Sequence, residues 1–324
     1  MKMTFRHYGD SDPVTLEKIR QIPGMYGIVS AIYDVPVGEV WSIEKIKEMV
    51  AKVEAAGMKL DVIESVPVHE DIKIGAPTRD KYIENYCTNI KNLAACGIKV
   101  ICYNFMPVFD WLRSDLEYKL DDNSSALIFK QEEVDAMDPR SSDLSLPGWD
   151  ASYTKEGLRD LLDKYKEVDA EKLWDNLKYF LEKIIPVCEQ VDVKMAIHPD
   201  DPPWPIFGLP RIITCVENYR RFAKLVDSKY NGFTFCTGSL GASKDNDLIA
   251  MIKEFGDRLP FVHLRNVKLT GEKSFEEAAH LSSSGSLDMY EIMKALFDVG
   301  FDGYVRPDHG RMIWGEEGRP GYGL

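Results

Sequence analysis

Four short apolar runs in the second half of the chain each end in a residue type that binds metal ions. The run KMAIH ends at His198, FTFC at Cys236, FVH at His263 and GYVRPD at Asp308. Strand interiors are normally Val, Ile, Phe and Leu, so ligand types at the ends of four successive runs indicate a shared site. Two imidazoles, a thiolate and a carboxylate suit a divalent transition metal better than calcium or magnesium. The pattern predicts a metalloenzyme.

Each of these four residues, taken alone, also has a purely structural interpretation. A histidine at a strand end is often a satisfied structural group, and a lone Cys236 would be a small buried hydrophobe. The acidic loop PDDPP after His198 and the GSLG after Cys236 favour the functional interpretation. Asp308 lies in RPDHGR, a dense polar cluster directly after an apolar run, whereas His263 in HLRN is ambiguous by itself. Together the four favour a metal site.

Eight apolar runs of strand character alternate with stretches of helical spacing. In one such stretch, Ile43, Ile46, Val50 and Val53 recur at helical spacing before Gly57 supplies a stop. Eight alternations predict a (β/α)8 barrel, in one domain over residues 1–324, rather than a doubly wound sheet. The carboxyl ends of the strands would then meet at one mouth, where active sites are built. The expected strands are residues 3–8, 26–33, 60–65, 99–105, 193–198, 232–236, 260–265 and 303–307.

The connection at residues 106–154 interrupts this alternation. It is long and carries the polar stretches DDNSS and DPRSSD. Connections of this length inside a compact domain are usually either functional or disordered. We expect a loop insertion after the fourth strand that forms a wall or lid at the mouth, with a disordered central part as the alternative.

The composition is that of an ordinary globular protein, with 44% hydrophobic and 29% charged residues among 324. A net charge of −13 gives no footprint for nucleic acid or an anionic membrane. The start, MKMTFRHYGD, has no apolar targeting region, and no apolar run approaches the ~20 residues of a membrane span. Six cysteines without regular spacing indicate reduced thiols and a cytoplasmic protein. Neither nucleic acid nor a membrane is expected as a partner, and a homodimer stays open.

Seven motifs stand out along the chain: IRQIPGMYGIVSAIYDVPVGEVW, VIESVPVHEDIKIG, CYNFMPVFDW, AIHPDDPPWPIFGLPRIIT, HLRNV, RPDHGRMIWG and RPGYGL. They resemble motifs of the mannonate dehydratase family, over essentially the whole chain. The resemblance implies the xylose-isomerase-like TIM barrel and the dehydration of D-mannonate to 2-dehydro-3-deoxy-D-gluconate and water in hexuronate (glucuronate) breakdown. It also implies Mn²⁺ or Fe²⁺ as cofactor, the same four ligands as above, and proton transfer by His309 and Tyr322.

Loss of water from a sugar acid needs a base for the C2 proton and an acid for the departing C3 hydroxyl. His309 has an ordinary pKa in the useful range, so we expect it to take the C2 proton. Tyr322 is expected to protonate the C3 leaving group, and the reverse assignment stays open. His69 is expected either to line the site or to stabilise its loop. Further residues expected to bind substrate, the arginines through its carboxylate, are Arg265, Arg306, Arg319 and Asn104.

Two features depart from the family pattern. The family usually reads Arg-Trp-Tyr/Phe-Gly where this chain has Arg6, His7, Tyr8 and Gly9, so the pocket is expected to change shape. The family also continues beyond the position of Leu324, so the ring of helices is expected to lack its last member. Two other functions stay open, namely a metal-dependent sugar isomerase or epimerase and a sugar-acid-binding relative without turnover.

Overall fold

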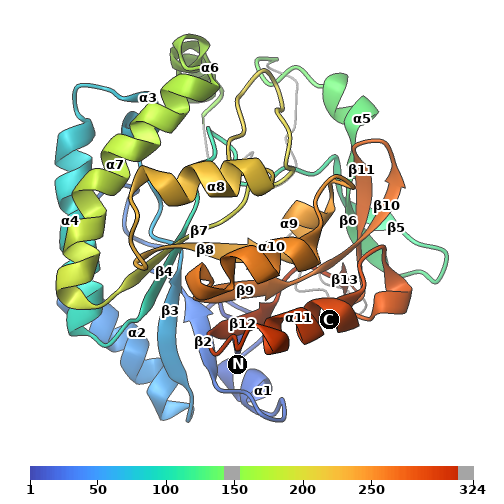
Figure 1. Cartoon of the computed structure of the whole chain (residues 1–324), viewed down its shortest axis with the longest axis horizontal. Helices are drawn as coiled ribbons and strands as arrows, with labels where there is room; N and C mark the ends of the chain where they lie inside the picture. Colours follow the sequence, from blue (N-terminus) through green and yellow to red (C-terminus); the bar gives the residue numbers. More distant parts are fainter. Residues whose placement is uncertain (142–153, 313–324) are drawn as a thin grey trace.

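Eight parallel strands form a closed barrel in the computed structural model, which describes residues 1–141 and 154–312. The strands follow one another around the barrel in chain order, and the last pairs with the first. Figure 1 shows the barrel strands at the centre of the molecule, with helices around them. This confirms the predicted barrel and each of its eight expected strands to within a few residues. They are β1 (Lys2–Arg6), β2 (Gly27–Ser30), β3 (Lys59–Glu64), β4 (Val100–Tyr103), β7 (Lys194–Ile197), β8 (Asn231–Cys236), β9 (Phe261–Leu264) and β12 (Tyr304–Pro307).

Helices connect the successive barrel strands on the outside. The predicted helix before Gly57 is confirmed as α2: the Ser42 side chain caps its start, and Gly57 follows with φ +77°, a conformation that glycine adopts without strain. The helices of these connections are α1 (Leu16–Arg20), α2 (Ile43–Ala55), α3 (Glu70–Ile74), α4 (Arg79–Ala95), α6 (Lys155–Lys164), α7 (Ala170–Val191), α8 (Val216–Leu225), α9 (Thr237–Gly241), α10 (Leu248–Phe255) and α11 (Met289–Asp298), with the 3-10 turns η1 (Tyr165–Glu167), η2 (Gly256–Arg258) and η3 (Ser282–Ser284).

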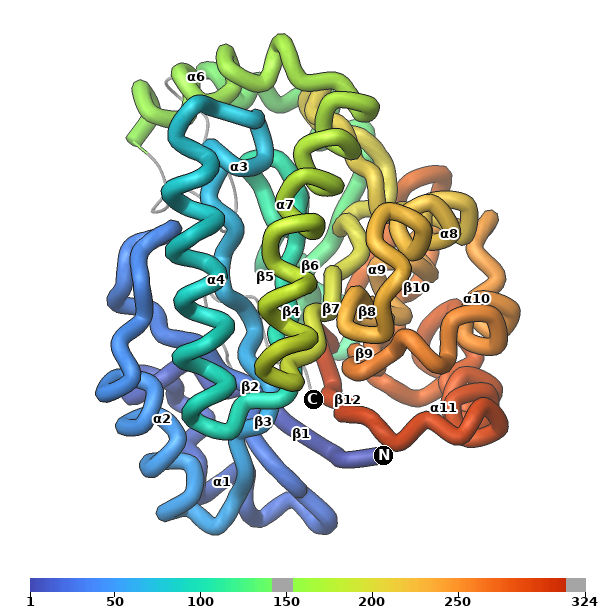
Figure 2. The backbone as a smooth tube through the Cα atoms, turned by 60° about the vertical axis from the view of Figure 1, so that its left-hand side comes forward, coloured from blue at the N-terminus to red at the C-terminus, as the bar shows by residue number. Residues whose placement is uncertain are grey.

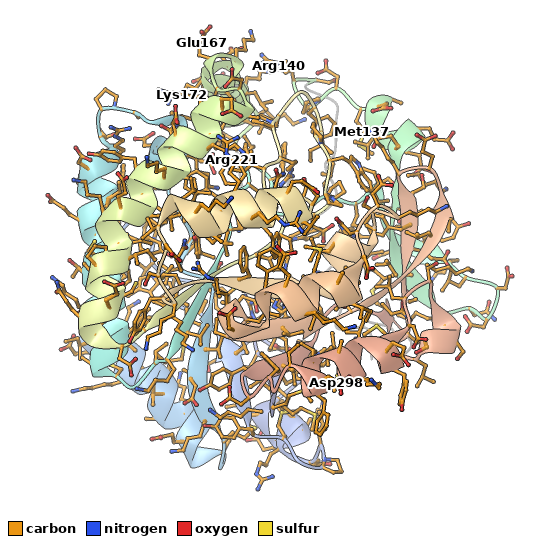
Figure 3. The ribbon with its side chains drawn as sticks, viewed as in Figure 1. Met137, Arg140, Glu167, Lys172, Arg221 and Asp298 are labelled. Carbon is orange, nitrogen blue, oxygen red and sulfur yellow. The ribbon has the colours of Figure 1, made fainter. Side chains whose placement is uncertain are left out.

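The longest helix, α7, buries its apolar stripe against the barrel and α4. Leu177 and Phe180 on this stripe are fully buried, and the Phe180 ring meets the edge of Tyr86 at a centroid distance of 5.0 Å. Figure 2 shows α4 and α7 side by side along their length. At its start α7 is also tied to α8 by the pair Arg221–Glu171, and Figure 3 shows Arg221 between the two helices. The helical layer therefore holds the barrel strands from outside.

Apolar side chains fill the interior of the barrel below its mouth. The barrel is therefore a packed core and not a pore, and any binding site must lie at one end. These buried side chains form one cluster: Val29, Val62, Val100, Cys102, Ala196, Phe261 and Tyr304.

Three connections at the carboxyl ends of barrel strands build a second, antiparallel sheet, here called the outer sheet. Its order is β10-β11-β6-β13, and β5 also pairs with β6 (Figure 1, right). The connection after β4 supplies β5 (Asp115–Lys119) and β6 (Ser125–Lys130), followed by α5 (Gln131–Asp135). The connection after β9 supplies β10 (Asn266–Gly271) and β11 (Ser274–Ala278), and β13 (Arg311–Met312) follows β12. The sequence did not predict these strands.

Two expectations fall partly or wholly outside the described residues. The insertion at 106–154 was expected to be a loop, but its described part forms β5, β6 and α5, and residues 142–153 lie outside the description. The expected absence of the last helix concerns residues after Met312, which also lie outside it. Within residues 1–141 and 154–312, no helix is long and apolar enough to cross a membrane.

Candidate metal centre and active site

The four predicted metal ligands meet at the carboxyl ends of four neighbouring barrel strands. His198 directly follows β7, Cys236 ends β8, His263 lies in β9 and Asp308 directly follows β12. Cys236 and His263 are register partners across β8 and β9. One ligand atom from each of the four side chains lies within 4.8 Å of the others. The structure thus brings together residues that are up to 110 positions apart in the chain, as the strand ends predicted.

The nitrogen, sulfur and oxygen atoms of the cluster lie close to one another. The Nε2 atom of His198 is 3.1 Å from Nδ1 of His263, and that Nδ1 is 3.6 Å from Oδ2 of Asp308. Sγ of Cys236 is 3.7 Å from the same Oδ2. Nδ1 of His198 lies 2.7 Å from the carbonyl oxygen of Pro199, to which it can donate. This contact favours the tautomer in which the lone pair of Nε2 is free to bind a cation.

A buried carboxylate orients the imidazole of His263 from behind. Nε2 of His263 is 3.3 Å from Oε2 of Glu64, at the end of β3. Glu64 also pairs with Arg306 at 2.9 Å and with Arg6 at 3.1 Å. Burial raises the pKa of Glu64, but Arg306, His263 and Arg6 together hold it well below its usual range. Glu64 is therefore ionised and directs Nδ1 of His263 toward the cluster.

Cys236 and Asp308 both carry negative charge at neutral pH. Burial raises the pKa of the Cys236 thiol, but hydrogen bonds with His198 and His263 outweigh this and lower it to about 5. Sγ of Cys236 also accepts a hydrogen bond from Ser239 Oγ at 3.2 Å. For Asp308, His309, Arg306 and His263 outweigh burial and hold the pKa well below its usual range. Two anions and two imidazoles form a donor set that fits a divalent transition metal.

A second close group, Glu64, Cys102 and His263, does not fit a cation. Glu64 already pairs with the guanidinium groups of Arg306 and Arg6, which a second metal would have to displace. Burial also raises the pKa of the Cys102 thiol well above its usual value, which opposes the thiolate form. This group is an ion-pair cluster behind the first one.

A cavity of about 210 Å³ opens above the four-residue cluster. Its lining is mainly charged and polar, which suits a small polar ligand. Besides the cluster residues His198, His263 and Asp308, the cavity is lined by Arg6, Tyr8, Glu64, Ser65, Cys102, Tyr103, Asn104, Met106, Asp110, Trp111, Asp201, Arg306 and His309.

His309 is placed to act as a base in this cavity. Its Nε2 lies 3.8 Å from Oδ1 of Asp308, and its ring centroid is 6.1 Å from that of Trp111. Nδ1 of His309 is buried without a hydrogen-bond partner among the described residues. Burial lowers the pKa of His309 more than Asp308 and Glu277 raise it. The imidazole is therefore neutral near pH 7 and can take up a proton.

The residues predicted to bind substrate have different positions. Arg306 and Asn104 line the cavity. Arg265 is outside the lining: it is fully buried, and its guanidinium contacts Asp201 at 2.7 Å and Glu277 at 2.6 Å. Unlike Arg306, Arg265 is not among the residues that line the cavity, and its expected contact with substrate stays a prediction. Arg319 and Tyr322 lie outside the described residues.

Two histidines near the mouth also lie outside the cavity lining. The side chain of His69 caps α3 by accepting a hydrogen bond from the Asp71 backbone at 3.0 Å, and it stacks on Tyr82. His69 thus has the loop-stabilising position rather than the substrate-binding one. Nδ1 of His7 accepts from the Gly9 backbone at 3.3 Å. Arg6 and Tyr8 on either side of His7 line the cavity and His7 does not, since alternate side chains of an extended segment face opposite sides; the expected change of pocket shape stays a prediction.

Several residues that line the cavity were not predicted from the sequence. Glu64 carried the same signal as the predicted ligands, since it ends the apolar run LDVIE. Asp110 and Trp111 follow the fourth strand in FDW, and Asp201 lies in the PDDPP loop after His198. These residues could have been found by extending the strand-end argument to β3 and to the first residues of each following loop.

The fold and the site together define a TIM-barrel protein with a polar cavity fitted for a divalent metal at its mouth. A xylose isomerase domain protein from Planctomyces limnophilus shares the barrel, with a TM-score of 0.55 at 12% identity over 96% of this chain and 89% of that chain. At this identity the likeness shows the fold alone.

Sequence comparison gives the family. The model of the D-mannonate dehydratase (UxuA) family matches residues 1–324. A mannonate dehydratase of Streptococcus agalactiae is 62% identical over 326 residues, covering 100% of this chain and 94% of that protein. The crystal structure of mannonate dehydratase from Streptococcus suis superposes with a TM-score of 0.92 at 51% identity, over 100% of this chain and 90% of that one. The chain belongs to the D-mannonate dehydratase family, which confirms the resemblance.

Proposed function

We propose that this chain dehydrates D-mannonate to 2-dehydro-3-deoxy-D-gluconate and water. The observation that carries the proposal is a cavity in which a four-donor cluster lies beside the neutral imidazole of His309. The family match over the whole chain supports the substrate.

The cluster of His198, Cys236, His263 and Asp308 would hold Mn²⁺ or Fe²⁺. Such an ion, when bound, supplies Lewis-acid stabilisation of the negative charge that builds up next to the substrate carboxylate. Calcium is a poor substitute, since it prefers six to eight oxygen ligands. Arg306 is proposed to attract the substrate carboxylate and Asn104 to hold a hydroxyl, because both line the cavity.

The chain's own residues must move four protons, and these movements balance. The C2 proton leaves, the departing C3 hydroxyl gains a proton, and when the enol becomes a ketone the C3 carbon gains one while the C2 hydroxyl loses one. His309 is proposed to take the C2 proton, and Asp308 would then stabilise the imidazolium from 3.8 Å. Tyr322 is proposed from the resemblance to take part in proton transfer, with the C3 leaving group as its expected place and the reverse assignment open.

We also propose that the enzyme works in the cytoplasm, in hexuronate (glucuronate) breakdown. The six cysteines support this location, since all are free thiols and reduced thiols are typical of that compartment. A homodimer stays an open prediction.

The test is turnover of D-mannonate by purified protein with added Mn²⁺, followed by mass spectrometry. The expected product is lighter than the substrate by one water and reacts as a 2-keto acid. A chelator should abolish the reaction, and Mn²⁺ or Fe²⁺ should restore it. A product of unchanged mass would indicate an isomerase or epimerase instead. Binding of D-mannonate in calorimetry without any product would indicate a relative that has no turnover.

A further inference from the structure

Four carboxyl groups line the cavity, and their charge environments differ. Glu64 pairs with Arg306 and Arg6, and Asp308 also pairs with Arg306, at 3.0 Å. The third, Asp201, has two arginine partners of its own, Arg113 and Arg265. Asp110 is the fourth. Among the cavity carboxyl groups within residues 1–141 and 154–312, Asp110 is the one without a cation at ion-pair distance.

The segment around Asp110 holds this carboxyl group in the wall of the cavity. The carbonyl oxygen of Phe109 accepts a hydrogen bond from Arg211 Nη2 at 2.9 Å, and Trp111 forms a β-bridge with Asp201. Phe109 and the nearby Leu112 are fully buried. The backbone on both sides of Asp110 is therefore held in place at the wall of the cavity.

The backbone two residues before Asp110 is strained. Val108 has a φ of +61°, which a β-branched residue rarely adopts. Conformations of this kind persist where the surroundings enforce them, and they concentrate at functional sites. The backbone N–H of Val108 donates to Oε2 of Glu70 at 3.4 Å, which is one contact that holds the strained residue.

The surroundings of Asp110 raise the pKa of its carboxyl group above that of an exposed aspartate. Burial is the largest effect and raises its pKa, and Glu70 raises it further. Lys73, a hydrogen bond with Asn104 and Arg211 act in the opposite direction but do not overcome burial. The ammonium of Lys73 is itself paired with Glu70 at 2.7 Å, which weakens its field at Asp110. A raised pKa favours the protonated form of a carboxyl group, and this form can donate its proton to a ligand.

We propose that Asp110 is the acid that protonates the C3 hydroxyl of the sugar acid as it leaves. The inference rests on the dehydration proposed above. When the C2 proton is removed, its electron pair forms the C2–C3 double bond and the C3–O bond breaks. The oxygen takes the proton of Asp110 and departs as water, leaving a carboxylate that regains a proton from solvent. In this scheme Asp110 takes the place first expected for Tyr322, which can still protonate the C3 carbon.

The experiment compares two substrates in one variant. Asp110→Asn keeps the size of the side chain but has no acidic proton. We expect it to slow turnover of D-mannonate about 10²–10⁴-fold, the usual contribution of a positioned acid. The 3-deoxy-3-fluoro analogue of D-mannonate should react at nearly the wild-type rate, because fluoride leaves without a proton. Exchange of the C2 hydrogen with solvent deuterium should persist in the variant, provided that wild-type exchange is reversible.

Control variants separate this role from folding and from Tyr322. Asp135→Asn changes an exposed carboxyl on α5 and should leave both substrates unaffected. Tyr322→Phe tests the alternative acid. If the fluoro analogue restored a nearly wild-type rate in Tyr322→Phe but not in Asp110→Asn, the proposal would be overturned. If Asp110→Asn does not fold, the pair Asp110→Glu and Asp110→Gln gives the same contrast, with activity on D-mannonate expected for Glu alone.

Two further outcomes would separate a failure of the role of Asp110 from a failure of the proposed function. An equal loss on both substrates in Asp110→Asn would make Asp110 a binding residue and would overturn its role as an acid. A wild-type protein that turns over neither substrate with Mn²⁺ would overturn the proposed function itself, and the role of Asp110 with it.

Discussion

The barrel mouth and its junction with the outer sheet both bury several charges, but in different balance. At the mouth, Cys236 and Asp308 place two anions beside two imidazoles, and they leave room for a cation. At the junction, two guanidiniums and two carboxylates neutralise one another; this group is here called the buried quartet and consists of Arg113, Asp201, Arg265 and Glu277. Converging ligand atoms with excess negative charge therefore indicate a metal-binding site. A buried group whose charges balance indicates instead a structural contact between two parts of the fold.

The buried quartet joins the outer sheet to the barrel. Glu277 lies on β11, whereas Asp201 belongs to the connection after β7. Arg113 bridges them, with 2.9 Å to Asp201 and 2.8 Å to Glu277. Burial raises the pKa of Asp201, but Arg113 and Arg265 hold it well below its usual range. Asp201 is thus ionised at neutral pH, and its ion pairs within the quartet fix the wall of the cavity.

The largest effect is expected at the mouth. Asp308→Ala should remove one anion of the cluster, and with it the bound metal. Turnover should fall at least about 10³-fold, since a catalytic metal contributes several kcal/mol. Elemental analysis of the purified variant should show little manganese or iron. Full metal content in Asp308→Ala would contradict the contrast between the mouth and the junction, because the mouth would then bind the metal without its excess negative charge.

Removing the neighbouring imidazole should separate metal binding from chemistry. His309→Ala should keep its metal, because His309 lies outside the four-donor cluster. Turnover should fall about 10²–10⁴-fold, as for other positioned bases. Exchange of the C2 hydrogen with solvent deuterium should disappear in this variant and persist in Tyr322→Phe. The opposite pattern would reverse the two proton-transfer roles.

The next effect belongs to the junction and concerns stability. Glu277→Ala should leave Arg113 and Arg265 short of one buried carboxylate, and should lower the free energy of unfolding by about 3–5 kcal/mol. Metal binding should persist in the folded fraction. The measurement is denaturant unfolding together with metal analysis.

A surface pair gives the matched control for the junction. Glu254→Ala breaks the exposed pair with Arg220 and should cost less than about 1 kcal/mol. Similar losses for the buried and exposed pairs would show that the quartet does not stabilise the joint.

The last prediction tests the residue behind the cluster and concerns metal affinity rather than turnover or unfolding. Glu64→Gln should remove the charge that orients His263 while leaving all four donors in place. Metal affinity should fall about 10–100-fold, the usual result of changing such a partner. Competition with a metal indicator dye would measure it. An unchanged metal affinity would show that Glu64 pairs with Arg306 and Arg6 without orienting His263.

The sequence by itself determined the barrel and the convergence of its strand ends. Strand periodicity and helical spacing are local patterns, so they can be read from neighbouring residues. In a closed parallel barrel all strand ends point to one mouth, and this rule alone brought His198, Cys236, His263 and Asp308 together. The motifs gave the family, which the match over residues 1–324 confirms.

Only the tertiary structure decided how the polar residues around that mouth are paired. The strand Ser125–Lys130 finds its partner in Ser274–Ala278, about 150 residues away, and no local pattern predicts such a pairing. Nor does the sequence distinguish Arg265, whose guanidinium forms ion pairs within the buried quartet, from Arg306, which lines the cavity. Asp110 has no signal beyond following a strand. The physical reason is that a charged group takes its role from the partners that burial forces upon it, and those partners come from distant parts of the chain.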